Sequence, residues 1–317
     1  MHPPLVLSVV ALVAGTIAAQ SQTATKAQSG APLMADREAI LGEIKVCEDA
    51  RRKAEAGHAA PATLAKMDVL AGSLYEDIRA YPEAEALLQH AVKELRGAPP
   101  AELGNALGEL AALHIAMDEH GKAEKESRES LALFEQAGDV KGVAMAHVDL
   151  ANAEIDNRHF AQAVDDAQKA MTVLADDPAT DIVERIAVRQ TLGFALGGAG
   201  RCSEAMPVLK NAMEIAGTAY GQDSLAVGVE KYLMGRTAWN CGDMVDADAW
   251  MGKGIARMKV DLGWGHMVYL SAVSQYAKFL RERGQKEEAA AEEREIRMAN
   301  AVVDARTIST APVNGLR

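Results

Sequence analysis

The sequence carries a small residue at intervals of about 40 positions through most of its length. The alanines of this column are separated by 39, 40, 42, 42 and 42 residues, and they are Ala84, Ala123, Ala163, Ala205, Ala247 and Ala289. A fixed period of roughly 20 to 50 residues is typical of repeat architectures, in which each unit buries its apolar face against its neighbours. The chain is therefore expected to fold as a stack of similar units.

Two further columns of small residues keep a constant offset from these alanines. Twelve positions earlier stand Gly72, Ala111, Ala151, Gly193, Gly235 and Ala277. Seven positions later stand Ala91, Ser130, Ala170, Ala212, Gly254 and Ile296. Small side chains at fixed offsets let antiparallel helices cross closely, because larger ones would push the backbones apart. Aromatic residues make up only 4% of the chain, which also disfavours a strand-rich fold.

Glycine and proline mark where the expected helices turn and end. Gly200, Gly242 and Gly284 occupy the same place in three hairpin turns, and breakers such as Gly138 follow the second helices. The pattern predicts helical pairs at residues 62–97, 99–137, 139–176, 178–217, 221–261 and 265–304. A helix over residues 36–57 precedes them, with Asp36 as its N-cap, and residues 305–317 form a tail.

The columns resemble the tetratricopeptide repeat family, in its longer kinesin-light-chain type. The best match runs from Leu192 and Gly193 through Gly200 and Ala205 to Ala212. The resemblance implies an all-α fold, a right-handed α-solenoid of about six hairpins over residues 62–304 with the preceding helix as a cap. The residues expected to pack the repeats are Gly72, Ala84, Ala123, Ala163, Gly193, Ala205, Gly235, Ala247 and Ala289.

In the family, the first helices of the hairpins line a concave groove that binds extended or helical peptides. Transferring the groove positions to this chain gives Asn152, Gln190, Phe194, Tyr232, Arg236, Trp239, Lys278 and Arg281. Aromatic side chains beside cations would suit a peptide with an apolar anchor and a nearby carboxylate. The alternative is that Phe194, Tyr232 or Trp239 packs between repeats.

One binding device of the family is absent. Its clamp for the acidic carboxyl termini of chaperones uses lysine, asparagine and arginine side chains on the first helices. The matching positions here hold Val69, Ser73, Glu109, Met145 and Asp149. Chaperone tails are therefore not the expected partner.

The amino terminus has the pattern of an export signal. Residues 1–25 contain no charged side chain, and residues 5–19 form an apolar run that is shorter than the roughly 20 residues a membrane span needs. The sequence predicts a signal peptide over residues 1–19 and a flexible linker over 20–35. The alternative is that residues 5–19 are retained as a membrane anchor.

The overall charge limits the class of partner. The formal net charge is −12 at pH 7. Nucleic-acid binding and polybasic membrane contact both depend on clustered Lys and Arg, so neither is expected. The expected partner is a protein or peptide, and the oligomeric state is left open.

No catalytic or metal-binding motif stands out, and no cofactor is expected. His120 and His159 could lie on one edge of adjacent repeats, but a shared metal would need further ligands. A catalytic pocket around Glu154, Asp156 and His159 is a less favoured alternative.

Two of the three cysteines fall at equivalent places in neighbouring repeats. Cys202 and Cys241 fall near the turns of the fourth and fifth hairpins, which places them one repeat apart on the same edge. Two small buried thiols are the favoured interpretation, and a disulfide formed in an oxidising compartment is the alternative. Cys47 is left unpaired in either case.

These observations favour a non-enzymatic interaction scaffold, exported to the periplasm or outside the cell. The alternatives are a membrane-anchored or cytoplasmic regulator with the same repeats and, less favoured, a ligand-binding or catalytic subunit.

Overall fold

The computed structural model describes residues 32–175, 180–264 and 266–309. Within those ranges the chain is built from thirteen α-helices and one short 3-10 helix, and it contains no β-strand. The predicted signal peptide and most of the predicted linker lie outside the described residues. No helix in the described ranges is both long and apolar enough to cross a lipid bilayer.

Helix α2 (Pro32–Ala56) is followed by six antiparallel helical hairpins. The first three are α3 (Pro61–Asp77) with α4 (Tyr81–Glu94) and the 3-10 helix η1 (Leu95–Gly97), α5 (Pro100–Ala116) with α6 (His120–Ala137), and α7 (Val140–Asp156) with α8 (Phe160–Leu174). The last three are α9 (Ile182–Gly198) with α10 (Cys202–Tyr220), α11 (Leu225–Asn240) with α12 (Met244–Leu262), and α13 (Met267–Glu282) with α14 (Lys286–Ser309). The all-α solenoid of six hairpins that the repeat predicts is confirmed.

The ends of the array differ from the prediction. Helix α2 begins at Pro32, four residues before the expected N-cap Asp36, because proline is well suited to a first helical turn. Helix α14 continues to Ser309 and so includes the first five residues of the predicted tail. The remaining tail, residues 310–317, lies outside the described residues.

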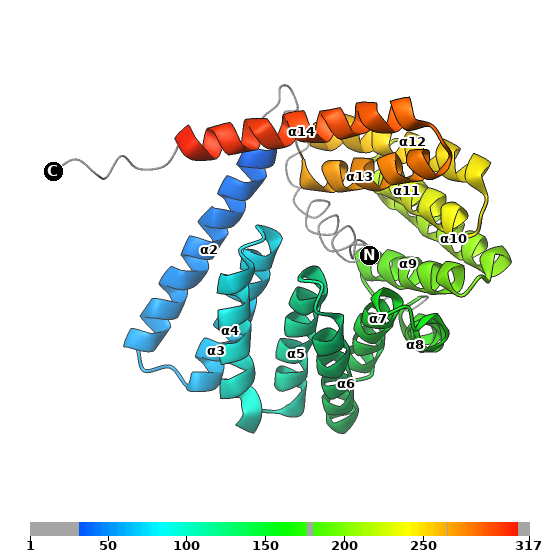
Figure 1. The fold of residues 1–317 in the computed structure, drawn as a ribbon. Helices are drawn as coiled ribbons and strands as arrows, with labels where there is room; N and C mark the ends of the chain where they lie inside the picture. The colour runs from blue at the N-terminus through cyan, green and yellow to red at the C-terminus, as the bar shows by residue number, and fades with distance from the viewer. Residues whose placement is uncertain (1–31, 176–179, 265, 310–317) are drawn as a thin grey trace.

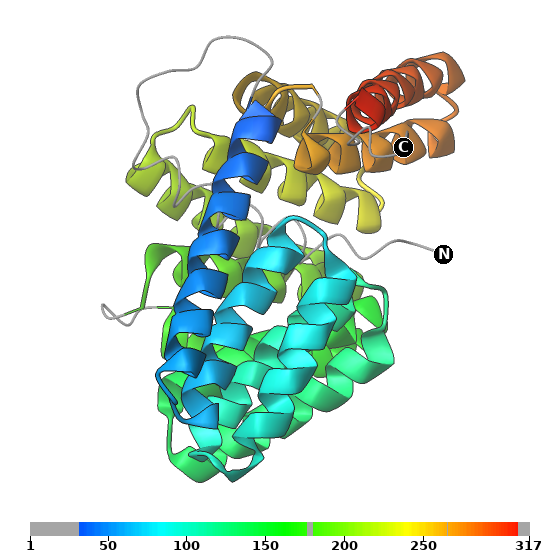
Figure 2. The same cartoon turned by 90° about the vertical axis from the view of Figure 1, so that its left-hand side faces the viewer.

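The hairpins form two layers that curve around a common axis (Figure 1). The first helices α3, α5, α7 and α9 each contact the next first helix, whereas the second helices contact the first helices on either side. The first helices therefore make the inner, concave layer. The curvature carries the amino-terminal end of α2 to the level of the last two hairpins in both views (Figures 1 and 2).

The columns of small residues lie where the helices cross. All six alanines of the reference column are fully buried. A Cβ atom added to Gly72 would lie 2.7 Å from Leu88, and one added to Gly193 would lie 2.5 Å from Leu209. The crossing of α11 and α12 is tighter still, because Gly235 and Gly254 both face backbone atoms of the opposite helix.

Each hairpin turn contains a residue in the left-handed conformation, always five positions before the reference alanine. Glycine supplies it in the last three hairpins, at Gly200, Gly242 and Gly284. In the first three hairpins the same position is held by Arg79, Asp118 and Arg158, with φ between 59° and 65°. The turn geometry is therefore common to all six hairpins, although only half of them carry the residue that adopts it without strain.

Candidate partner-binding groove

The inner layer is held together by polar side chains that reach from one first helix to the next. Asn152 accepts a hydrogen bond from the Thr191 hydroxyl at 3.0 Å, which joins α7 to α9. The Trp239 indole N–H donates to Glu282 at 2.9 Å, which joins α11 to α13. Gln190 donates to Glu230 between α9 and α11. Several groove positions predicted from the sequence are thus occupied by contacts within the chain.

The aromatic residues of the predicted groove pack mainly against the protein itself. Tyr232 is completely buried and Phe194 is 4% exposed, and both belong to the largest apolar cluster of the molecule. Trp239 is half-buried, with its ring edge-on to Phe279 at a centroid distance of 5.5 Å. The alternative of packing between helices therefore describes Tyr232 and Phe194, and the apolar anchor site expected from three exposed rings is not formed by them.

The two arginines of the predicted groove have acidic or aromatic partners. Arg281 makes a two-pronged salt bridge to Glu293 on α14, with two N–O distances of 2.7 Å. The Arg236 guanidinium lies over the Phe194 ring, 5.9 Å from its centroid. Burial raises the pKa of Asp156 to about 7, although Arg236 opposes this shift. Lys278 is half-buried on α13. These contacts weaken the expectation of an acidic peptide, because much of the positive charge is already balanced.

A group of carboxylates lies on the first helices of the first three hairpins. Glu76 and Asp77 lie at the end of α3, Glu109 on α5 and Asp149 on α7. The Ser73 hydroxyl donates to the Glu109 carboxylate, and Asp149 lies against Gly108 of α5. We call Glu76, Asp77, Glu109 and Asp149 the carboxylate cluster.

The members of the carboxylate cluster are hard to ionise together. Burial and the neighbouring charge of Glu109 raise the pKa of Glu76 to about 8, of Asp77 to about 6 and of Asp149 to about 7. Like charges in a partly desolvated site disfavour the charged form of each group. Near pH 7 the cluster therefore retains protons, and ionising it fully would place several negative charges close together.

The sequence contained a signal for this cluster. Glu109 and Asp149 occupy two of the positions where the related clamp would carry basic or amide side chains, and Ser73 occupies a third. In the sequence, these residues show only that the clamp is absent. The gathering of several carboxylates is not apparent there, because Glu76 and Asp77 lie outside the clamp pattern.

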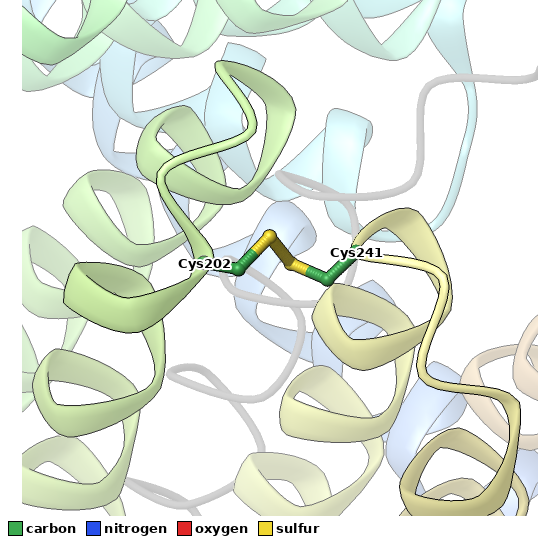
Figure 3. Close-up of a disulfide and its surroundings, with 2 residues drawn as sticks. All are labelled: Cys202 and Cys241. Carbon is green, nitrogen blue, oxygen red and sulfur yellow. A yellow bond between two sulfur atoms is a disulfide. The ribbon is translucent and has the colours of Figure 1, made fainter.

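Cys202 and Cys241 form a disulfide between the fourth and fifth hairpins (Figure 3). Cys202 begins α10 and Cys241 follows α11, with a Cα–Cα distance of 5.9 Å. Cys47 is a buried free thiol on α2. The bridge lies at the edge of the stack, close in sequence to Arg236 and Trp239.

The residues of the less favoured catalytic pocket lie in two surroundings. Glu154 is buried beside Arg128 and Asp166, whereas Asp156 responds to Arg236. His159 is half-exposed and lies 3.7 Å from Glu124. Glu124 is a neighbour of both Glu154 and His159, whereas Asp156 lies near Arg236.

Comparison with known proteins gives matches at the level of structure alone. No protein-family model matches the sequence, and no curated protein matches it. The apo form of RapI has a TM-score of 0.66 at 13% identity, over 85% of this chain and 94% of that one. BtubC (BKLC) from P. vanneervenii has a TM-score of 0.56 at 20% identity, over 72% and 92%.

Two further solved structures widen the comparison. A Rap protein complexed with Competence and Sporulation Factor has a TM-score of 0.59 at 12% identity, over 83% of this chain and 77% of that one. A putative kinesin light chain of Podospora anserina with TPR-like repeats has a TM-score of 0.53 at 17% identity, over 63% and 96%. The chain thus has the fold of the tetratricopeptide-like helical-repeat proteins.

Proposed function

We propose that this chain is an exported, non-enzymatic scaffold that binds a basic segment of a partner protein on its concave face. The observation that carries the proposal is the carboxylate cluster, in which Glu76, Asp77 and Asp149 all have raised pKa values near Glu109. This differs from the acidic peptide expected from the sequence, because the aromatic rings are largely buried and Arg281 is paired within the chain.

A basic occupant would relieve the repulsion within the cluster. A Lys or Arg side chain between these carboxylates favours their charged forms and so lowers their pKa values. Charge-assisted hydrogen bonds to carboxylates are shorter and roughly twice as strong as neutral ones. Binding of a cation thus relieves the electrostatic repulsion between the carboxylates, which gives the groove a preference for cationic segments.

The comparisons support a binding role for the fold. One of the similar structures is a Rap protein in complex with Competence and Sporulation Factor. An array of repeats offers an extended concave surface, and this surface is what such proteins use for binding.

Export is supported by the Cys202–Cys241 disulfide, because disulfides persist in oxidising compartments and are rare in the cytosol. The apolar run at residues 5–19 is consistent with this. Cell fractionation followed by amino-terminal sequencing tests the proposal. A mature protein that starts after residue 19 and resists thiol alkylation at Cys202 is expected. A cytosolic protein that retains Met1 would contradict export.

Binding is tested by calorimetry with two short peptides, one of alternating lysine and serine and one of alternating glutamate and serine. The lysine peptide is expected to bind, with affinity that falls as salt increases. Protons should be released near pH 7, because the cation lowers the pKa of Glu76 and Asp149. The apparent binding enthalpy should therefore change with the ionisation enthalpy of the buffer.

A matched pair of variants locates the site. The double substitution Glu109→Gln with Asp149→Asn removes two charges from the carboxylate cluster, and Glu129→Gln with Glu135→Gln removes two exposed charges from α6. The first pair should weaken the lysine peptide at least tenfold and the second pair far less. Equal losses in both would show that net charge alone attracts the peptide. The same variants, used as bait with an envelope extract, separate genuine partners from charge-driven background.

A further inference from the structure

A buried histidine lies at the junction of α4, α5 and α6, away from the carboxylate cluster. His114, near the end of α5, is 1% exposed. Its Nε2 atom faces Glu85 of α4 and Glu119, the residue that precedes α6. Its Nδ1 atom faces Glu126, about two turns further along α6. Three helical segments thus bring three carboxylates around one imidazole.

The distances around Nε2 are those of ligands around a shared ion. Nε2 lies 3.4 Å from Glu85 Oε1 and 3.6 Å from Glu119 Oε2, which is longer than an ordinary N–H···O hydrogen bond of about 2.9–3.0 Å. The three ligand atoms all lie within 4.8 Å of one another. In tetrahedral zinc sites, bonds of about 2.0–2.1 Å place neighbouring N and O ligands roughly 3.3–3.4 Å apart.

The other side of the imidazole is fixed as it is in metal sites. Nδ1 lies 2.6 Å from Glu126 Oε2. A metal-bound histidine almost always donates its second ring N–H to a carboxylate, a carbonyl or water, which sets the ring orientation and leaves the other nitrogen free for the metal. Glu126 takes this supporting role, since its carboxylate faces Nδ1 and not Nε2.

A surface cation currently lies near the same two carboxylates. The Lys122 ammonium is 2.6 Å from Glu119 Oε2 and 3.9 Å from Glu85 Oε1. Its side chain is 54% exposed. Exposed ion pairs of this kind contribute little to stability, so the ammonium can move aside at little cost. Lys122 therefore competes with a metal cation for the carboxylates of Glu85 and Glu119.

We propose that Glu85, His114 and Glu119 form a binding site for a divalent transition-metal cation, with Glu126 positioning the histidine. The mixed imidazole and carboxylate ligands suit Zn²⁺ better than Mg²⁺ or Ca²⁺, which take oxygen ligands. The site joins the first hairpin to the second, so bound metal fixes α4 against α5 and α6. The ligands span 35 residues and three helices, which is why no motif in the sequence revealed them.

A protonated imidazole is the competing explanation. Burial lowers the pKa of His114, but the carboxylates of Glu126 and Glu85 outweigh it and the net shift is upward. In that case the cluster would simply hold a buried charge, and added metal would not bind. The two explanations are separated by direct titration at a pH above the range in which histidine titrates.

The experiment uses untagged full chain, because a polyhistidine tag itself binds zinc. Calorimetry at pH 8 with Zn²⁺ should show one saturable site, and thermal unfolding should shift upward when zinc replaces EDTA. Absorption of the Co²⁺-loaded protein reports directly on a nitrogen and oxygen ligand set.

Single substitutions test which residues bind the metal. Glu119→Gln removes a half-exposed ligand with little risk to folding and should weaken zinc binding by roughly tenfold or more. Lys122→Met removes the competing ammonium and should tighten it. His159→Asn, at a half-exposed histidine on another hairpin, should leave it unchanged. The proposal is overturned if no saturable site exists, or if Glu119→Gln binds zinc as tightly as the unaltered chain.

Discussion

A Cβ atom on Gly235 would lie 2.5 Å from the backbone nitrogen of Met251 on the opposite helix. Backbone cannot move aside as a flexible side chain can, so α11 and α12 cross at a separation that only glycine permits. The same crossing is reached from the other side by Gly254, which faces the carbonyl of Gly228. The fifth hairpin is therefore the most closely packed of the array.

Gly235→Ala is expected to destabilise the protein by about 1–3 kcal/mol, because overpacking forces the two helices apart. Gly252→Ala is the matched control on α12, where a Cβ would meet only the Tyr276 hydroxyl at 3.8 Å. There alanine should be neutral or stabilising by up to about 1 kcal/mol through its higher helix propensity. Urea unfolding measures both. Equal effects would show that the crossing has room for a methyl group.

Substitutions at two equivalent turn positions should change the unfolding free energy in opposite directions. Gly200 has φ of +75° with nothing within 4 Å of an added Cβ, so Gly200→Ala should cost about 1 kcal/mol through backbone conformation alone. Arg79 adopts φ of 59° at the equivalent position of the first hairpin. Arg79→Gly should therefore gain up to about 1 kcal/mol. Thermal unfolding of both variants tests the prediction, and a loss at both positions would contradict it.

The disulfide should contribute strongly to stability. Cys202 and Cys241 are 39 residues apart, and closing a loop of that length in the unfolded chain corresponds to about 4 kcal/mol in the loop-entropy model. Replacing both with serine should lower the unfolding free energy by about 2–4 kcal/mol. Reduction of the unaltered protein should have a similar effect, whereas Cys47→Ser leaves the bridge intact. Alkylation after non-reducing denaturation should label Cys47 only.

A buried carboxylate predicts how stability changes with pH. Burial raises the pKa of Glu230 to about 8, although the hydrogen bond from Gln190 opposes the shift. The unfolded value is about 4.3, so the folded state binds more protons between these values. The contribution of this group to stability is present below about pH 4 and is lost as the pH rises through about 8.

Glu230→Gln is therefore expected to raise the melting temperature at pH 8 more than at pH 5. The amide keeps an acceptor for Gln190 and removes the cost of ionisation. Glu214→Gln, at an exposed position of α10, should produce no such difference. A gain that is equal at both pH values would show that the effect comes from packing and not from ionisation.

The fold could be predicted well because it depends on the spacing of small residues along the sequence. The reference alanines and the glycines twelve positions earlier lie at helix crossings, where size alone decides which residue fits. The cysteines could be placed near each other for the same reason, since one repeat separates them.

The site was harder to predict because orientation within a helix matters there. Tyr232 and Arg236 lie on one face of α11, yet the first is completely buried and the second is partly accessible. Spacing cannot show that Glu293 of another helix pairs with Arg281, nor that Glu109 lies within electrostatic reach of Asp149. These features depend on the distance between neighbouring helices.

The disulfide between the fourth and fifth hairpins also determines the order in which the hairpins unfold. The largest apolar cluster extends from Ala151 to Ala289 and contains that covalent link within its span, whereas the first two hairpins share a separate, smaller cluster. In a linear array, fraying starts at the end with the weakest neighbour contacts. Under limited proteolysis the amino-terminal hairpins should therefore be digested first, leaving a resistant carboxy-terminal fragment.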